Sequence, residues 1–495
     1  MMYGEEKSDS LIVAANLANN PQGAESVERR SGAKGNAEQP HMRRTQSRES
    51  MSQRLSRVRE AAKQRKKERF TALFHLLTAE ALENAFLSLS RKAAAGVDGV
   101  RWKDYAENLK VNIADLHRRL HQGSYRAQPG RRHYITKADG KQRPLGIASL
   151  EDKIVQYALV KILNAVYEND FMGFSYGFRP GRSQHNALDA LATGLVRTNV
   201  NWVLDADISQ FFDKVSHEWL IRFIEHRIGD QRVIRLIRKW LTAGTSEEGE
   251  WRASEEGTPQ GAVISPLLAN IYLHYVFDLW AHQWRRRHAT GNVVMVRYAD
   301  DIVIGFDKRI DAQCFRIAMQ RRLKEFGLTV HPKKTRLMEF GRFAAENRAS
   351  RGKGKPETFN FLGFTHISGK DRSGRFMLIR KTRRDRMTAT LKAIKDGLRK
   401  RWHYSIPEQG KWLRRVVQGY LNYHSVPGNY PMMRKFRIYV TDLWRRALRR
   451  RSQQDDTTWT KANRLAAVWL PKVRVLHPWP VERFTARHPR QEPGA

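Results

Sequence analysis

The sequence predicts an α+β fold that is followed by a bundle of helices. Two short runs rich in β-branched residues, Val293–Val296 and Ile302–Phe306, flank an acidic turn in the pattern of a β-hairpin. The run Trp202–Ile208 alternates apolar and polar positions, as a half-buried strand does. Amphipathic helical patterns lie before, between and after these strands, which favours an antiparallel sheet crossed by helices.

The chain is strongly basic. Among its 495 residues, lysine and arginine outnumber aspartate and glutamate by 90 to 50, which gives a formal net charge of +40. An excess this large favours a polyanionic partner, and nucleic acid is the first expectation. A merely solubilising surface charge is the alternative.

Cysteine usage and hydropathy exclude several other classes of protein. The single cysteine, Cys314, excludes an internal disulfide framework and any zinc or iron–sulfur site built from several cysteines. No apolar run is long enough to span a membrane, and the patch Leu11–Ala15 follows two glutamates where a signal peptide needs positive charge. We therefore expect a cytoplasmic protein that associates with nucleic acid and not with a membrane.

Residues 1–69 contain one aromatic residue, Tyr3, and are dominated by polar and charged residues. Such a segment cannot bury enough apolar surface to fold alone, so we expect a basic, disordered N-terminal extension. Its later part, from Met51 to Arg69, has alternating charges and is able to become helical against a partner such as RNA.

Ordered structure is expected from about Phe70. Apolar residues recur at helical spacing up to Leu89, and a second helix is predicted over Trp102–His121. The Asp139-Gly140 step between two short strands then predicts a basic β-hairpin.

The middle of the chain alternates helices and short strands. The predicted elements, in order, are helix Glu151–Tyr167, an ordered loop over Gly173–Ser183, a helix from about His185, strand Trp202–Ile208, helices His217–Arg227 and Val233–Leu241, a hairpin over Thr245–Glu256 and a helix from Ser265. Two glycines in the loop Gly257–Gly261 let the backbone approach a ligand closely.

Beyond the acidic turn, the pattern becomes increasingly helical and basic. The predicted elements are helix Ala312–Phe326, a strand over Gly327–Thr335 that ends in two cations, a strand over Phe359–Phe364, and three basic amphipathic helices over Arg386–Arg401, Lys411–Tyr423 and Met432–Arg451. The sequence pattern does not indicate a role for the segment Trp459–Ala495.

The acidic turn Tyr298–Asp301 carries two adjacent carboxylates. Carboxylates beside a buried sheet are costly unless a cation neutralises them, and Mg²⁺ prefers such oxygen ligands. Asp205 and Asp207 share one face of the strand Trp202–Ile208, so that strand supplies a further carboxylate if the two strands are neighbours. An ordinary Asp-rich turn is the alternative at this point.

Several ordered blocks together resemble a known family, the reverse transcriptases encoded by bacterial group II introns, also called intron maturases. The blocks are Gly96–Gly99, Arg143–Ile147, Tyr176–Arg179, Asp207–Asp213, Gly257–Gly261, Tyr298–Asp301, Lys333–Thr335 and Phe361–Phe364. The resemblance spans about Phe70 to Arg451. It implies a right-hand polymerase fold, with a reverse transcriptase domain of fingers and palm over residues 70–378 and a helical thumb, the maturase domain X, over residues 379–452.

The resemblance also implies a metal site. In that family the matched Asp207, Asp300 and Asp301 bind two Mg²⁺ ions, which Mn²⁺ can replace, and the carbonyl of Ile208 is a further oxygen ligand. Two such ions activate the primer 3′-hydroxyl and offset charge on the leaving group. Asp205 is the rival ligand on the same strand.

A nucleotide pocket follows from the same matches. Gln260 is expected to line the incoming nucleotide, and the alternative is an ordinary turn glutamine. Phe212 is expected to block a ribose 2′-hydroxyl. The alternative for Phe212 is packing in the core, a role that suits Phe211 better. Lys137 and Arg143 are expected to bind the triphosphate. Lys334 assists pyrophosphate departure or makes a plain phosphate contact.

The expected partners are intron RNA, an RNA template with a DNA primer, dNTP and target DNA. Six arginines are the predicted nucleic-acid contacts: Arg179, Arg182, Arg414, Arg415, Arg445 and Arg446. Many relatives end in a DNA-binding region and an endonuclease with paired cysteines, and we expect residues 453–495 to be a basic extension without that domain.

The expected function is an RNA-directed DNA polymerase that also assists the splicing and mobility of its intron. Two alternatives stay open. One is an RNA-binding splicing cofactor whose polymerase site is vestigial, and the other is a domesticated or antiviral-defence reverse transcriptase that works away from an intron.

Overall fold

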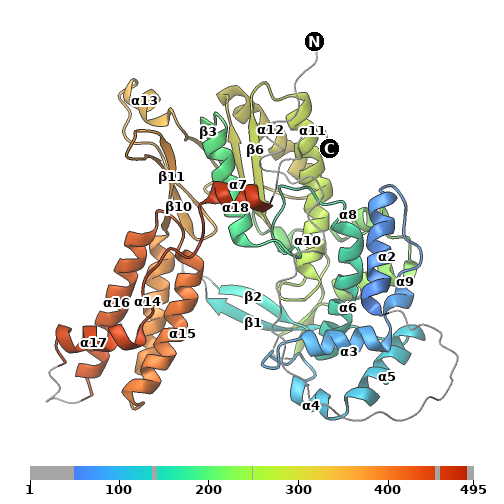
Figure 1. Ribbon diagram of the computed structural model, residues 1–495. Helices are drawn as coiled ribbons and strands as arrows, with labels where there is room; N and C mark the ends of the chain where they lie inside the picture. Colours follow the sequence, from blue (N-terminus) through green and yellow to red (C-terminus); the bar gives the residue numbers. More distant parts are fainter. Residues whose placement is uncertain (1–49, 137–141, 248, 452–456, 488–495) are drawn as a thin grey trace, which may run out of the picture.

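The computed structural model describes residues 50–136, 142–247, 249–451 and 457–487 (Figure 1). A four-stranded sheet with helices on both faces lies between a group of N-terminal helices on one side and a C-terminal helical bundle on the other. The α+β class with antiparallel sheets and a helical C-terminal region is confirmed. None of the described helices is both long and apolar enough to cross a membrane.

The central sheet is built from β3 (Trp202–Asp207), β6 (Val293–Tyr298), β7 (Asp301–Phe306) and β8 (Arg336–Glu339). The strand order is β6-β7-β3-β8, and every neighbouring pair is antiparallel. The hairpin expected around the acidic turn is therefore confirmed, and the strand that carries Asp207 is its direct neighbour.

Each face of the central sheet buries its own hydrophobic core, because successive side chains of a strand point to opposite faces. Leu204 and Ile304 belong to the larger core, which also holds side chains of α10 (Ser265–Leu273) and α12 (Arg309–Glu325). Val203 and Val303 belong to a second core against α7 (Gln184–Arg197).

The long helix predicted from Ser265 is interrupted. After α10 it continues as one π-helical turn, His274–Asp278, and then as α11 (Leu279–Arg287). The strand predicted over Gly327–Thr335 is wrong: Val330 makes one bridge to Ile208, the two lysines lie in a turn, and the strand β8 begins after them.

The N-terminal helices are α2 (Met51–Gln64), α3 (Ala79–Ser88), α4 (Trp102–Glu107), α5 (Leu109–His121), α6 (Leu150–Tyr167), α8 (His217–Glu225) and α9 (Gln231–Thr242). The expectation of disorder up to residue 69 is wrong for residues 51–64. Ser50 caps α2, and Leu55 and Val58 pack against the larger core. Asn108 divides the single helix that was predicted over Trp102–His121.

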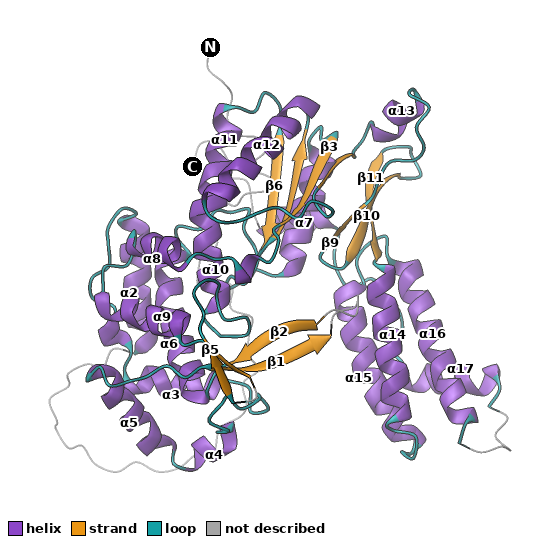
Figure 2. Ribbon diagram, turned by 180° about the vertical axis from the view of Figure 1, so that it is seen from behind, coloured by secondary structure: helices purple, strands orange, loops and turns teal. Residues whose placement is uncertain are grey.

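A smaller sheet projects beneath the central sheet (Figure 2). It has the order β2-β1-β4-β5, with β1 (Gly130–Thr136), β2 (Gln142–Ile147), β4 (Thr245–Glu247) and β5 (Glu250–Arg252). The two predicted hairpins are thus confirmed and pair with each other through β1 and β4. The tip of the first hairpin, with Lys137, lies outside the described residues.

A third sheet leads to the C-terminal bundle. It is formed by β9 (Phe359–Phe361), β10 (Phe364–Lys370) and β11 (Phe376–Thr382), and the short helix α13 (Ala344–Ala349) precedes it. The bundle comprises α14 (Arg384–Arg399), α15 (Ile406–His424), α16 (Tyr430–Arg449) and α17 (Trp459–Trp469). Because β11 runs to Thr382, the bundle begins a few residues later than the expected boundary at 379.

After α17, the chain returns to the central sheet, a course that the sequence did not indicate. Helix α18 (Pro480–Arg487) packs on α7, and Phe484 is buried in the core between α7 and the sheet (Figure 1). Arg483 forms an ion pair with the buried Asp189 of α7, and His477 stacks on His185 with ring centroids 4.0 Å apart. We call residues 471–487 the C-terminal strap, since they tie the bundle to the sheet.

Replacing Arg483 with methionine should destabilise the protein, because the buried carboxylate of Asp189 would keep only Arg380, 3.6 Å away. Loss of one partner of a buried ion pair costs about 3 kcal/mol. The midpoint of urea unfolding measures this change. The matched control is Arg446→Met: the Arg446 side chain is 68% exposed, so its ion pair with Asp442 should contribute less than about 1 kcal/mol. Equal midpoints for the two variants would contradict the role of the strap.

Candidate active site

The turn between β6 and β7 presents the predicted pair of aspartates at one end of the central sheet. Ala299 adopts a left-handed conformation with φ of 56°, which non-glycine residues rarely do. Gly177 lies against this turn so closely that a Cβ atom there would be 2.3 Å from the Ala299 nitrogen. A strained residue wedged against a glycine gives the tip a defined shape.

The third predicted carboxylate meets this turn across the sheet. Asp207, at the end of β3, pairs directly with Asp301, so their side chains point to the same face. Asp205 lies on that face too, two positions back along β3. Its carboxylate lies 4.0 Å from Arg336, and burial, the largest cause, raises its pKa to about 6.

The pKa values show that negative charge is crowded here. Burial raises the pKa of Asp300, and Asp207 adds to the shift. Asp301 is exposed, yet its pKa rises to about 7, because surrounding protein atoms hinder hydration and three carboxylates repel its charge. Those carboxylates are Asp300, Asp207 and Asp205.

Lys334 supplies part of the missing positive charge. Its Nζ lies 2.9 Å from Oδ2 of Asp207, and it also favours the charged form of Asp300. Within the described ranges, no three His, Cys, Asp or Glu side chains are gathered as a preformed metal cluster. The predicted site is thus a set of neighbouring carboxylates, with a lysine bound to one of them, and not a closed cage.

Two of the predicted nucleotide residues, Arg143 and Gln260, belong to one hydrogen-bonded chain. Arg143 of β2 donates from Nε to Oε1 of Gln260 at 2.9 Å, and Gln260 donates from Nε2 to Oδ1 of Asp213 at 2.6 Å. Arg143 also favours the charged form of Asp300. The chain therefore links β2, the loop over 257–261 and the turn Phe211–Asp213 beside the acidic turn.

Phe212 is fixed next to that loop. Its carbonyl accepts a 2.7 Å bond from the Thr258 nitrogen, and its ring lies 5.3 Å from the ring of Phe211 in a T-shaped arrangement. Phe211 is buried in the core, as expected, whereas Phe212 is half-buried. Ile208 has a buried side chain and bridges to Val330.

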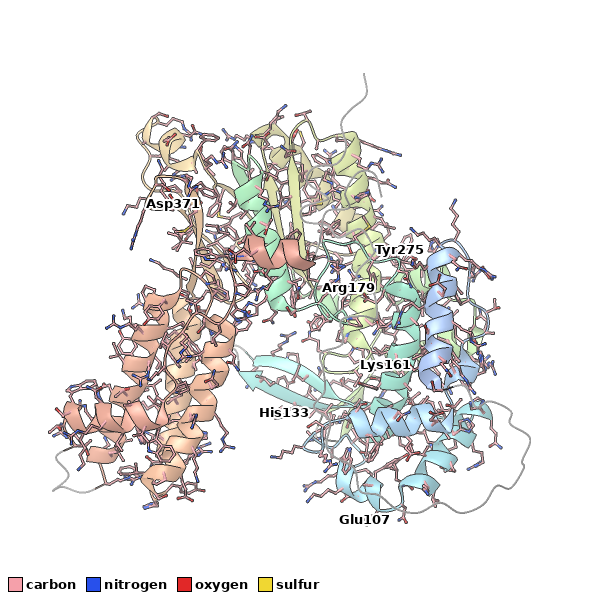
Figure 3. All side chains as sticks on the ribbon, viewed as in Figure 1. Glu107, His133, Lys161, Arg179, Tyr275 and Asp371 are labelled. Carbon is pink, nitrogen blue, oxygen red and sulfur yellow. The ribbon has the colours of Figure 1, made fainter. Side chains whose placement is uncertain are left out.

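Arg179 is buried, which contradicts its predicted contact with nucleic acid, whereas Arg182 is half-buried and its contact stays a prediction. The guanidinium of Arg179, a residue labelled in Figure 3, pairs with Glu168 at 2.9 Å and donates to two carbonyl oxygens. Arg182 donates to the Gly173 carbonyl at 2.5 Å and lies over the ring of Tyr176. Both side chains hold the loop before α7 together.

The predicted contacts in the bundle divide into two kinds. Arg445 is half-buried, bonds Asp442 at 3.0 Å and lies over the ring of Trp459, and its contact with nucleic acid stays a prediction. Arg414 and Arg415 of α15 and Arg446 of α16 are exposed. These three can reach a partner.

Residues 135–366 match the family model described as reverse transcriptase (RNA-dependent DNA polymerase). The matched range contains the three carboxylates, Arg143, Phe212, Gln260 and Lys334. Among curated proteins, 206 residues are 43% identical to protein YkfC of Escherichia coli, and 223 residues are 37% identical to the group II intron-encoded protein LtrA of Lactococcus lactis. The chain therefore contains a segment of reverse transcriptase type that is similar to a group II intron-encoded protein.

The relatives are matched over part of their length. The aligned part covers 41% of this chain and 54% of YkfC, and 44% of this chain and 37% of LtrA. A putative COX1/OXI3 intron 1 protein of Saccharomyces cerevisiae is 26% identical over 393 residues, 66% of this chain and 46% of that protein. The chain therefore spans about half the length of the curated relatives that it matches, or less.

Sequence reasoning missed the role of four residues that shape the candidate site. Asp213 orients Gln260, and a buried group beneath the acidic turn consists of Arg297, Asp278 and Asn270. Arg297 and Asp213 lie inside or beside the blocks that carry the family resemblance, which was the available signal. Asp278 and Asn270 lie in a helix that reads as purely structural.

Proposed function

We propose that this protein is an RNA-directed DNA polymerase with a right-hand arrangement. The central sheet is its palm, the N-terminal helices and the β1–β2 hairpin are its fingers, and α14–α16 are its thumb. The observation that carries the proposal is the direct pairing of Asp207 with Asp301 beside Asp300, within the range matched by the reverse transcriptase model. Extension of a DNA primer on an RNA template with dNTP and Mg²⁺ tests it.

We infer that the carboxylates of Asp207, Asp300 and Asp301 hold two divalent ions, with Mg²⁺ as the expected species. The donor set fits, because Mg²⁺ takes hard oxygen ligands and these carboxylates are short of counter-charge. Bound there, such ions stabilise the attacking and leaving oxygens of an in-line displacement. The ion pair between Lys334 and Asp207 would then break, and Lys334 would pair with a phosphate instead.

The nucleotide would lie over the chain formed by Arg143, Gln260 and Asp213. The guanidinium of Arg143 suits a triphosphate, since its donors match phosphate oxygens. Asp213 orients the Gln260 amide so that the amide oxygen of Gln260 faces Arg143. A phosphate bound to Arg143 would free this oxygen to bond the sugar or the base. The ring of Phe212 would meet the sugar.

Template and primer would lie between the palm and the thumb. Arg414, Arg415 and Arg446 are exposed on the thumb helices, and the whole chain is strongly basic. Binding should weaken steeply with salt because phosphate contacts release counterions. Assistance of intron splicing is the second part of the proposal; it is favoured by this basic bundle and by the similarity to an intron-encoded protein.

Replacing Arg143 with alanine should raise the KM for dNTP by roughly tenfold, because one charge-assisted phosphate contact is lost. Steady-state primer extension at saturating template measures the change. The control is Arg252→Ala, since Arg252 lies in the same sheet, is exposed and pairs with Glu247 at 3.5 Å. Equal KM values for the two variants would remove Arg143 from the nucleotide pocket.

A further inference from the structure

Beneath the acidic turn lies a buried ion pair that the proposed chemistry does not use directly. Arg297 of β6 and Asp278 of the π-helical turn are both 0% exposed, and their side chains form two bonds of 2.6 and 2.7 Å. We propose that Arg297 is a positioning residue that sets the backbone of the turn carrying Asp300 and Asp301. The inference rests on the proposed polymerase function and deepens it.

The guanidinium of Arg297 donates hydrogen bonds to four residues. Besides Asp278, it donates to Oδ1 of Asn270 in α10 at 3.1 Å and to Oγ of Ser175 before α7 at 2.7 Å. Its Nη1 also donates to the carbonyl oxygen of Ala299 at 3.0 Å. That carbonyl belongs to the peptide group that leads into Asp300, so the guanidinium fixes the turn from inside the protein.

The backbone around the turn depends on the same group. Ala299 is the left-handed residue of the turn, and the backbone of Arg297 also pairs with the segment before α7 through bonds of 2.8 and 2.9 Å. Asn270 donates from its amide to the carbonyl of Gly177, the glycine against which Ala299 is packed, at 2.7 Å. The network thus holds both the turn and the surface it rests on.

Stability alone does not account for an ion pair at this position. Apolar residues of similar volume often replace a buried ion pair without loss of stability, because desolvation offsets the attraction between the charges. What apolar residues cannot supply is a donor at a fixed angle to the Ala299 oxygen. The π-helical turn supports this reading, since it shifts Asp278 out of the regular helical register, and such turns are frequent at functional sites.

The expected consequence is a defined spacing between the carboxylates. Reactive groups must be held within about 0.5 Å of their productive geometry, and a misplacement of about 1 Å costs on the order of 10²-fold in rate. The Asp300–Asp301 pair is anchored on one side by β7 and its pairing with β3. On the other side the anchor is Arg297 through the Ala299 carbonyl.

Two variants test the inference. In Arg297→Lys, the ammonium keeps its charge next to Asp278 but cannot reach all four acceptors at once. In the double variant Arg297→Met with Asp278→Leu, the pair becomes apolar and the fold is retained without the donor. The matched control is Arg227→Met with Asp170→Leu, which removes another largely buried pair of 2.7 Å that lies outside this network.

The first readout is Mn²⁺ binding to the protein without nucleic acid or dNTP, followed by electron paramagnetic resonance. We expect both Arg297 variants to bind Mn²⁺ at least tenfold more weakly than the wild type, and the control to bind it like the wild type. In primer extension, kcat should fall by roughly 10²-fold with a KM for dNTP within about threefold of the wild type. Circular dichroism and thermal melting verify that each variant is folded.

Folded Arg297 variants with wild-type Mn²⁺ affinity and kcat would overturn the inference. The same loss in the control would overturn it too, because it would reflect general destabilisation. If Arg297→Lys is folded and the double variant is not, Arg297→Lys decides alone. Failure of the proposed function is seen separately, as a wild-type protein that binds Mn²⁺ but adds no dNTP; in that case Mn²⁺ affinity still decides the role of Arg297.

Discussion

Replacing Asp300 with asparagine should lower the rate of dNTP addition by roughly 10³-fold or more. Asparagine has nearly the same shape but lacks the negative charge that a divalent ion requires. A metal ion contributes several kcal/mol to such a reaction, and each decrement of about 1.36 kcal/mol is tenfold in rate. Single-turnover extension of a DNA primer on an RNA template measures the effect, while retained RNA affinity shows that the rest of the protein is intact.

The structure supplies a close control for this variant. Asp205 lies on the same sheet face but faces Arg336, 4.0 Å away. The rate of dNTP addition by Asp205→Asn should therefore stay within about tenfold of the wild-type rate. Asp300→Asn should also melt no lower than the wild type without metal, because it removes one of the mutually repelling charges that raise the pKa of Asp301 to about 7. An active Asp300→Asn protein would contradict the proposed polymerase.

The central hairpin could be predicted because its sequence signals are local. The strand patterns in Val293–Tyr298 and Asp301–Phe306 have a period of two residues. The acidic turn connects the two strands directly, so the hairpin can be predicted without any distant segment. The amphipathic helices of the bundle were predicted for the same reason, and their cores are formed by residues such as Val417 and Val440. The periodicity of apolar residues indicates which face of a helix or strand is buried, even when the element that packs against it is unknown.

Elements whose position depends on distant partners were not predictable in this way. Helix α2 looks too polar to fold alone, yet Arg227, more than a hundred residues later, donates to the Arg65 and Glu68 carbonyls at its end. The C-terminal strap is similar, since Arg483 finds its counter-charge in Asp189 of α7. Neither contact leaves a trace in local composition.

The arginines illustrate why residue type alone overpredicts a nucleic-acid surface. Arg179, Arg182 and Arg445 lie in basic stretches like their exposed neighbours, but each has its donors or its ring contact inside the protein. A guanidinium offers several donors and can join separate segments of chain as readily as it binds phosphate. The resemblance to a family pointed to the acidic turn and to the predicted nucleotide residues but carried no information on burial.

Replacing Phe212 with valine should let the polymerase accept ribonucleotides. The ring of Phe212 is half-buried, and its backbone is held by the bond from Thr258, so it cannot move aside to admit a 2′-hydroxyl. Removing that volume should raise kcat/KM for rNTP relative to dNTP by roughly 10- to 10²-fold, the range that a small steric difference in a pocket usually gives. Extension reactions with single rNTPs and dNTPs measure the ratio.

Phe211→Val separates selectivity from packing. Phe211 is 2% exposed and belongs to the larger core, so its truncation should lower stability by about 2–4 kcal/mol. Its ring lies 5.3 Å from that of Phe212, but it does not replace Phe212 at the loop over 257–261. We therefore expect Phe211→Val to melt earlier and to keep the wild-type rNTP to dNTP ratio, whereas Phe212→Val changes the ratio with a smaller loss of stability. A ratio changed by Phe211→Val and unchanged by Phe212→Val would show that Phe211, and not Phe212, meets the sugar.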